Sequence, residues 1–267
     1  MNGDSDVSRY LNNNINVFLS VLPDTDTKET PEAIVSLINR GEGDEELLKK
    51  FIARQTNPVN VAQVKNDEYL TILMQHNLVI PTWENVDNMY SRVETNDELV
   101  KYILNNREKF VKMKCETSQA IEIEKLLLIE TELVPEEFES FANCFADKIS
   151  ADEIGKLPEE NLRVLNTKNL LEFNDATITA IKNTCSLNMM IEYLQHHFDD
   201  FISYEEMPID ISQEISIGLL NSSLTLEQKK QFLELYPFNV EGDSTEEYAR
   251  LYCFYYEKIN DFTNADH

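Results

Sequence analysis

A short sequence pattern recurs four times along the chain and constrains the fold more than any other feature. Its copies are Leu78–Val86, Leu133–Phe138, Leu170–Asp175 and Leu224–Gln228. In each copy an apolar helical stretch ends, two or three apolar residues follow, and a capping residue or a proline opens the next helix. Recurrence of this kind is typical of stacked helical repeats. The sequence therefore predicts an all-α fold, an α-solenoid of irregular HEAT-like or TPR-like helical repeats.

The spacing between the copies is irregular. Successive copies lie about 54 or about 37 residues apart, whereas known two-helix and three-helix repeats have periods of about 34 to 47 residues. A globular helical bundle is therefore the alternative architecture. Only 6 glycines and 8 prolines occur in 267 residues, which argues against many tight β-turns and favours helices in either case.

Capping boxes support the expectation of many helices. In such a box a Ser or Thr hydroxyl accepts a hydrogen bond from the backbone N–H three residues on, and the Glu or Gln side chain at that position bonds back. Four candidate boxes pair Thr95 with Glu98, Ser150 with Glu153, Thr225 with Gln228, and Ser244 with Glu247. The segment Thr30-Pro31-Glu32 predicts a further helix start, since proline is favoured at the first helical position.

The sequence divides into two predicted parts. Residues 1–62 are predicted to form an N-terminal helical segment, a degenerate repeat, and residues 63–267 the repeat array with a C-terminal capping helix. That last helix, Thr245–Asp261, is rich in tyrosine on one stripe, which predicts that it packs over the last repeat. The alternative is that the same stripe forms a weak homodimer contact.

Charge restricts the classes of partner. The chain has 23 Lys and Arg against 49 Asp and Glu, a formal net charge of −26. Such a chain repels the phosphate backbone of nucleic acid and the anionic surface of a membrane, so neither is expected as a partner. Solubility of a large helical surface explains the acid excess, and a protein or peptide with a basic patch is the partner that this charge favours.

The four cysteines, Cys115, Cys144, Cys185 and Cys253, lie far apart without a CxxC spacing. In a chain of this length they indicate reduced and mostly buried thiols. The polar, acidic N-terminus lacks the features of a secretory signal, and the densest apolar run, residues 126–129, is too short to span a membrane. These features predict a soluble, cytoplasmic protein.

No residue cluster matches a template for catalysis or cofactor binding, so we expect no catalytic residue and no cofactor. The closest glycine pair, Gly41 and Gly43, precedes acids that would repel phosphate. His196 and Asp200 have the i, i+4 spacing of metal ligands on one helix face, although a polar helix end accounts for them without further ligands. The alternative function is a metal-dependent hydrolase whose site assembles His196, Asp200 and one or two cysteines from distant parts of the chain.

Aromatic residues supply the candidate contacts with a partner. Trp83 is the sole tryptophan, and a single aromatic anchor can dominate a binding surface, although a tryptophan in the first turn of a repeat helix more often fills the seam between units. Tyr90 lies beyond it, and Tyr252 and Tyr256 lie on the C-terminal helix. These four residues are the predicted partner-binding residues.

The string from Leu78 to Val86, with Tyr90 beyond it, resembles the C-terminal helical region of bacterial YobI-like P-loop NTPases. The resemblance covers this string and the general rhythm of the chain from about residue 67 onward. It implies the non-catalytic helical part of a larger ATPase. The phosphate loop of that family has no counterpart here, so ATPase activity is not implied. We therefore expect a non-catalytic interaction or scaffold module.

Overall fold

The computed structural model describes residues 14, 17, 31–40, 45–204, 207–237 and 246–265. Within these residues the fold is all-α, as expected, and the β-structure consists of two isolated bridges. The described residues form two compact units. Unit 1 comprises the described residues up to Leu133 together with Asn143–Ala146, and unit 2 comprises Val134–Ala142 and the described residues from Asp147 onward.

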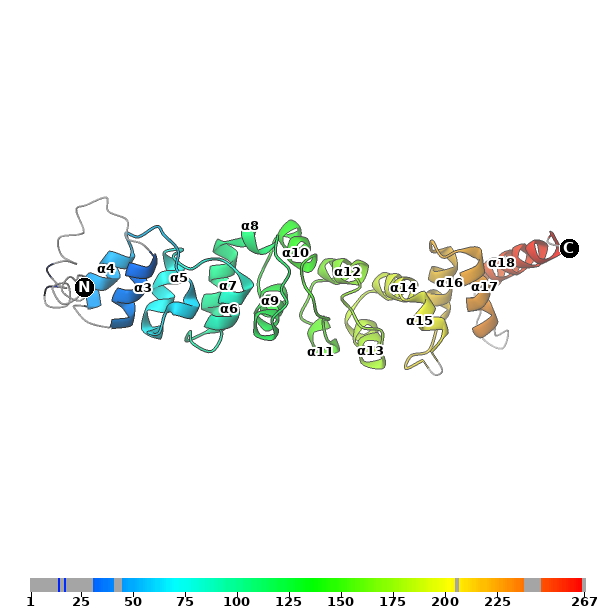
Figure 1. Cartoon of the computed structure of the whole chain (residues 1–267). Coiled ribbons are helices and arrows are strands. Elements are labelled where there is room, and N and C mark those ends of the chain that lie inside the picture. Colours follow the sequence, from blue (N-terminus) through cyan, green and yellow to red (C-terminus); the bar gives the residue numbers. More distant parts are fainter. Residues whose placement is uncertain are drawn as a thin grey trace. The chain divides into compact units, whose positions relative to one another are not determined.

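Unit 1 consists of short helices in chain order (Figure 1). They are α3 (Pro31–Arg40), α4 (Glu45–Ile52), the 3₁₀ turns η2 (Val61–Gln63) and η3 (Asp67–Tyr69), α5 (Leu70–Gln75), α6 (Trp83–Met89), α7 (Asn96–Asn105), α8 (Arg107–Phe110) and α9 (Ser118–Glu130). Helix α9 packs against both α6 and α7, and α5 packs against α4 and α7.

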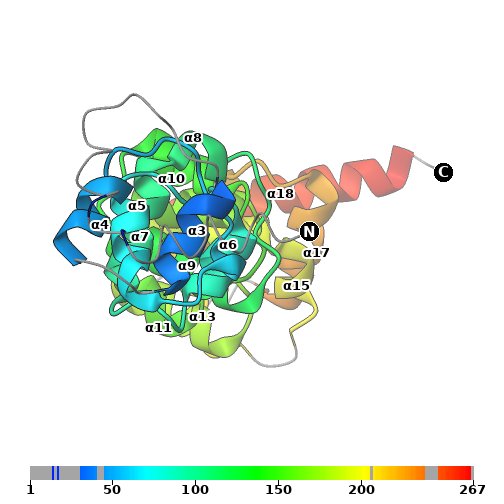
Figure 2. The ribbon, with the colours of Figure 1, turned by 60° about the vertical axis from the view of Figure 1, so that its left-hand side comes forward.

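Unit 2 also consists mainly of short helices. They are α10 (Pro135–Ala142), α11 (Ala151–Ile154), α12 (Glu159–Thr167), α13 (Asp175–Thr184), α14 (Leu187–His196), α15 (Phe198–Ile202), α16 (Gln213–Asn221), α17 (Leu226–Leu235) and α18 (Glu246–Ala265). Helix α14 packs between α12 and α16, and α18 lies against α16 and α17. Figure 2 shows α18 beside α17. These contacts agree with a terminal helix that packs on the preceding helices, and its role as a capping helix stays a prediction.

Apolar residues at helical spacing build the core of each unit. In unit 1 the rings of Tyr102 and Phe110 are almost fully buried and meet edge to face with centroids 5.9 Å apart. In unit 2, Phe201 and Phe232 are fully buried with centroids 6.1 Å apart. Large buried rings of this kind dominate the stability of the core, which explains why short helices with one apolar face remain folded here.

The helix caps follow the sequence in part. At Ser150 the backbone N–H donates to Glu153, and at Thr225 the reciprocal box with Gln228 is complete. The expected box at Thr95 is wrong, because the Glu98 carboxylate instead accepts a hydrogen bond from the Thr71 hydroxyl at 3.1 Å. The expected box at Ser244 lies outside the described residues.

Two of the four copies of the recurring pattern, those at Leu78 and Leu170, have the same local structure, one in each unit. Asn77 in unit 1 and Asn169 in unit 2 adopt left-handed backbone angles, with φ of 55° and 58°. Each ends a helix, and the following leucine N–H bonds to a carbonyl five residues back. Two residues beyond each asparagine, a parallel bridge forms: Val59 with Val79 in one unit, and Ile149 with Leu171 in the other.

Matched features in the two units are separated by about 92 residues, which is close to the sum of the two irregular spacings, about 54 and about 37 residues. The segment 207–211 is neither helix nor strand. The solenoid arrangement and the division at residues 62 and 63 stay predictions.

Candidate functional site

Trp83 lies inside unit 1. The Thr82 hydroxyl caps α6 by accepting from the Asn85 N–H, which places Trp83 in the first turn. Its side chain is 5% exposed, its indole N–H donates to the Met113 carbonyl at 3.0 Å, and its ring meets Phe110 edge to face at 4.8 Å. Trp83 therefore acts as a packing residue in this structure.

The other predicted partner-binding residues lie nearer the surface. Tyr90 forms the C-cap of α6 and is half-buried. Tyr252 and Tyr256 stack on one face of α18 with ring centroids 6.0 Å apart, and Tyr256 is 54% exposed. The structure thus brings Tyr252 and Tyr256 together, whereas Trp83 and Tyr90 belong to the other unit. Their role in binding stays a prediction.

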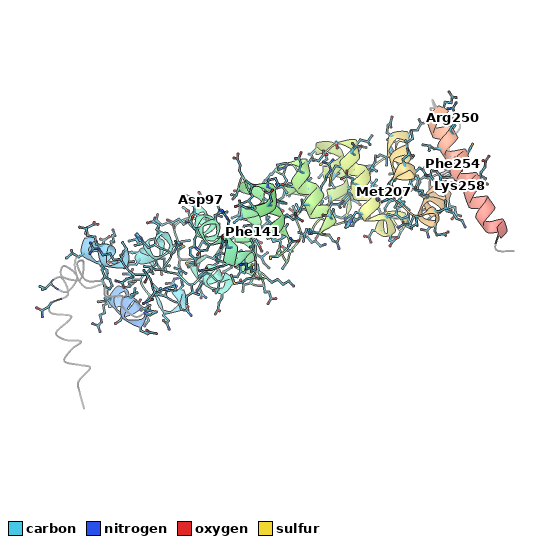
Figure 3. All side chains as sticks on the ribbon, turned by 90° about the horizontal axis from the view of Figure 1, so that it is seen from above. Asp97, Phe141, Met207, Arg250, Phe254 and Lys258 are labelled. Carbon is cyan, nitrogen blue, oxygen red and sulfur yellow. The ribbon has the colours of Figure 1, made fainter. Side chains whose placement is uncertain are left out.

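Helix α18 also has an exposed stripe that carries cations. Arg250, Phe254 and Lys258 follow one another along the helix (Figure 3). Phe254 is 48% exposed, and the Lys258 ammonium lies 4.3 Å from its ring centroid. Since a cation over a ring face is attracted by the ring quadrupole, Lys258 covers part of this apolar surface.

A buried lysine anchors α18 to α17. Lys229 is 8% exposed, and its ammonium donates to the Ser222 carbonyl at 3.0 Å and to the Tyr255 hydroxyl at 3.3 Å. The same ammonium lies 4.8 Å from the Tyr255 ring centroid. These contacts satisfy a charge that burial would otherwise destabilise.

The two adjacent histidines lie at a helix end, where His196 is exposed and His197 is buried. Helix α14 ends at His196 and α15 begins at Phe198, so the i, i+4 geometry expected for His196 and Asp200 is interrupted. His197 instead faces Asp200, with Nδ1 3.7 Å from the carboxylate. His197 is 7% exposed, its Nε2 atom has no hydrogen-bond partner among the described residues, and burial lowers its pKa below the ordinary value.

The most unusual group is Glu124, on the inner face of α9. Its side chain is fully buried, and neither carboxylate oxygen has a hydrogen-bond partner among the described residues. Burial raises its pKa to about 8, and the neighbouring Cys115 thiol offsets part of that increase. Glu124 was missed at the sequence level, although a helical wheel places it on one face with Ala120, Leu127 and Leu128.

Two thiols belong to the same region. Cys115 is fully buried, and burial together with the Glu124 charge raises its pKa to about 12. Cys144 is half-buried, donates to the Val111 carbonyl at 2.9 Å, and also has a raised pKa because of burial and the Glu124 charge. Because a nucleophilic cysteine needs a lowered pKa, both thiols are held in an unreactive form in this packing.

Among the residues that the structure describes, no group of three or more His, Cys, Asp or Glu side chains is arranged to hold a metal ion. Over the same residues, no helix combines the length and the apolar character that crossing a bilayer requires. Comparison of the chain with known protein families, with characterised proteins and with solved structures gave no match.

Proposed function

We propose that this chain is a non-catalytic protein-interaction or scaffold module built from helical repeats, which binds a basic patch or a basic extended peptide. The observation that carries the proposal is the acid excess, 49 Asp and Glu against 23 Lys and Arg. Of the acidic residues that the structure describes, only Glu124 is buried. The remaining carboxylates lie where a cationic ligand can reach them.

The ends of the helices support the same proposal. The C-terminal end of a helix carries a partial negative charge that a basic residue in the last turn would offset. Among the described α-helices, eleven have no basic residue in that turn: α5, α6, α7, α9, α10, α11, α12, α15, α16, α17 and α18. Without a basic side chain to offset them, the last carbonyl groups of these helices add to the negative electrostatic potential of the protein.

Calorimetric titration tests the electrostatic part. A Lys- and Arg-rich peptide is expected to bind saturably and more weakly as salt is raised, because screening reduces attraction between exposed charges. A peptide of the same length in which Glu replaces every basic residue, and a duplex DNA, serve as controls. Binding of either control as tightly as the basic peptide would contradict the proposal.

Charge-neutralising variants locate the binding surface. One variant changes three exposed first-turn acids of unit 1 to their amides, and the matched variant does the same in unit 2. The residues are Glu84, Asp97 and Glu108 in unit 1, and Glu136, Asp152 and Glu160 in unit 2. A specific surface predicts that one variant weakens binding more than the other. Equal, small effects would indicate a diffuse attraction without a defined site.

The proposal also includes the larger setting: an α-solenoid in the cytoplasm that forms the helical region of a bacterial P-loop NTPase. The αL asparagine and the parallel bridge, found once in each unit, support a repeated architecture. Solution X-ray scattering tests the solenoid. A compact domain of 267 residues would have a radius of gyration of about 18 Å, and a solenoid a clearly larger one. A value near the compact one would favour the globular bundle.

A further inference from the structure

Comparison of the two units shows that Glu124 is a departure from a shared pattern. Helices α9 and α16 each follow a Thr or Ser N-cap, Thr117 and Ser212. Four buried residues of α9 match the buried residues of α16 about 92 residues apart: Ile123 with Ile215, Glu124 with Ser216, Leu127 with Leu219, and Leu128 with Leu220. The Ser216 hydroxyl is satisfied, since it donates to the Ser212 carbonyl at 3.0 Å. The same helical position therefore tolerates a small, hydrogen-bonded residue.

Glu124 has no such partner. It is fully buried between α9 and the elements that pack on it, and both of its oxygens lack a hydrogen bond among the described residues. An ionised carboxylate without a partner is strongly destabilised in a protein interior, whereas the neutral acid costs much less. The packing of α9 against α6 and α7 therefore requires a proton on Glu124.

The groups around Glu124 do not supply a counter-charge. The connection before α9 contributes the Cys115 thiol, and the segment Asn143–Ala146 contributes Cys144. Helix α6 contributes Asp87, an acid whose charge acts on Cys115.

The charged residues of α7 are engaged elsewhere or face solvent. Asp97 and Lys101 are exposed, and Glu98 accepts from Thr71. Ionisation of Glu124 thus adds a negative charge to a site whose other titratable groups are neutral or acidic.

We propose that Glu124 is a proton-controlled switch in unit 1: with its proton it keeps α9 packed, and loss of that proton to solvent favours opening of α9 and exposure of the Cys115 and Cys144 thiols. This switch would make the accessibility of two otherwise shielded thiols depend on the pH around the protein. It goes beyond the proposed binding of a basic partner and does not depend on it.

Proton linkage gives the pH window. The pKa of Glu124 is about 8 in the packed state and near its ordinary value of 4.5 once exposed to water. Because the pKa of Glu124 is higher in the packed state, its full contribution to stability is present below pH 4.5. This contribution is lost progressively as the pH rises to 8. The equilibrium constant for opening should rise about 70-fold between pH 5.5 and 7.5, and less than about twofold between pH 8.5 and 9.5.

Hydrogen–deuterium exchange of the full chain tests this with an internal control. After correction for the intrinsic pH dependence of exchange, the protection of α9 amides should fall about 70-fold between pH 5.5 and 7.5. Protection of the matched helix α16, which has Ser216, should show no such fall over the same range. Equal pH dependence of α9 and α16, or none in either, overturns the proposal.

The variant Glu124→Gln keeps the shape of the side chain and removes the titration. Alkylation of Cys115 and Cys144 in brief pulses, followed by mass spectrometry, should give a wild-type to variant ratio that rises about 70-fold over the same range. The ratio at each pH cancels the ionisation of the thiols themselves. A ratio that does not change with pH overturns the proposal. If Glu124→Gln does not fold, Glu124→Ser, with the residue of the matched helix, replaces it in the alkylation test. If neither variant folds, the exchange comparison of α9 with α16 in the wild type decides.

Discussion

Removing the hydroxyl of Tyr102 tests whether burial or bond length decides the strength of a hydrogen bond in this fold. Tyr102 donates to the Val79 carbonyl at 3.1 Å, and both residues are almost fully buried. In unit 2 Tyr193 makes the corresponding bond, to the Glu172 carbonyl, at 2.5 Å, but Glu172 is exposed. The more buried hydrogen bond is therefore the longer one. Burial and bond length thus rank the two bonds in opposite order of strength.

The magnitudes follow from the fate of the carbonyl left behind. In Tyr102→Phe the buried Val79 oxygen loses a partner that water cannot replace, which costs about 1.5–3 kcal/mol. In Tyr193→Phe water can reach the Glu172 oxygen, so the cost is about 0.5–1.5 kcal/mol. Neither change creates a cavity larger than a hydroxyl group.

Urea unfolding followed by circular dichroism at 222 nm measures both losses. With a slope of about 2 kcal/mol per molar urea, a loss of about 2 kcal/mol lowers the midpoint by about 1 M. The wild type and both variants should share the same slope, so that midpoints compare stability alone. A greater loss for Tyr193→Phe than for Tyr102→Phe would refute the reasoning and give bond length the larger weight.

Three further predictions follow from single positions. Thr225→Ala should cost about 1 kcal/mol of unfolding free energy and Thr95→Ala almost nothing, because only Thr225 makes a cap bond; equal losses in urea unfolding would contradict this. Asn169→Ala should cost about 1 kcal/mol and Asn169→Gly almost nothing, because φ is 58°; thermal unfolding of the two variants gives the order. The lowered pKa of His197 means that its contribution to stability is lost as pH falls below its ordinary value of 6.5, so His197→Asn should become more stable relative to the wild type between pH 7 and pH 5 in urea unfolding. An unchanged pH dependence in that variant would show that other groups cause the loss.

The all-helical fold could be predicted because its signals are local. The cap at Thr225 and the helix start at Pro31 act within one or two turns of chain, and both are confirmed. The box at Thr95 could not be excluded from the sequence, since the competing partner of Glu98 is Thr71, far away in the chain. His196 is exposed and ends α14, as the reading of a polar helix end expects, but the helix break at His197 could not be inferred from periodicity alone.

The candidate switch was harder to find for a physical reason. A glutamate in a helix is almost always solvated, so α9 suggests at first an exposed face for Glu124. Its burial follows from α6 and α7 packing over α9 from earlier parts of the chain. Only the comparison with Ser216 in unit 2 identifies the position as one that the architecture does not require to be acidic.

The place of Trp83 has a practical consequence. It is the only tryptophan of the chain, and it is buried in unit 1 beside Phe110. Light of about 295 nm therefore excites an indole that reports on unit 1 alone. Circular dichroism cannot make this distinction, because both units consist of similar helices. A shift of its emission to longer wavelength would record the opening of unit 1 in real time, without a label and without a contribution from unit 2.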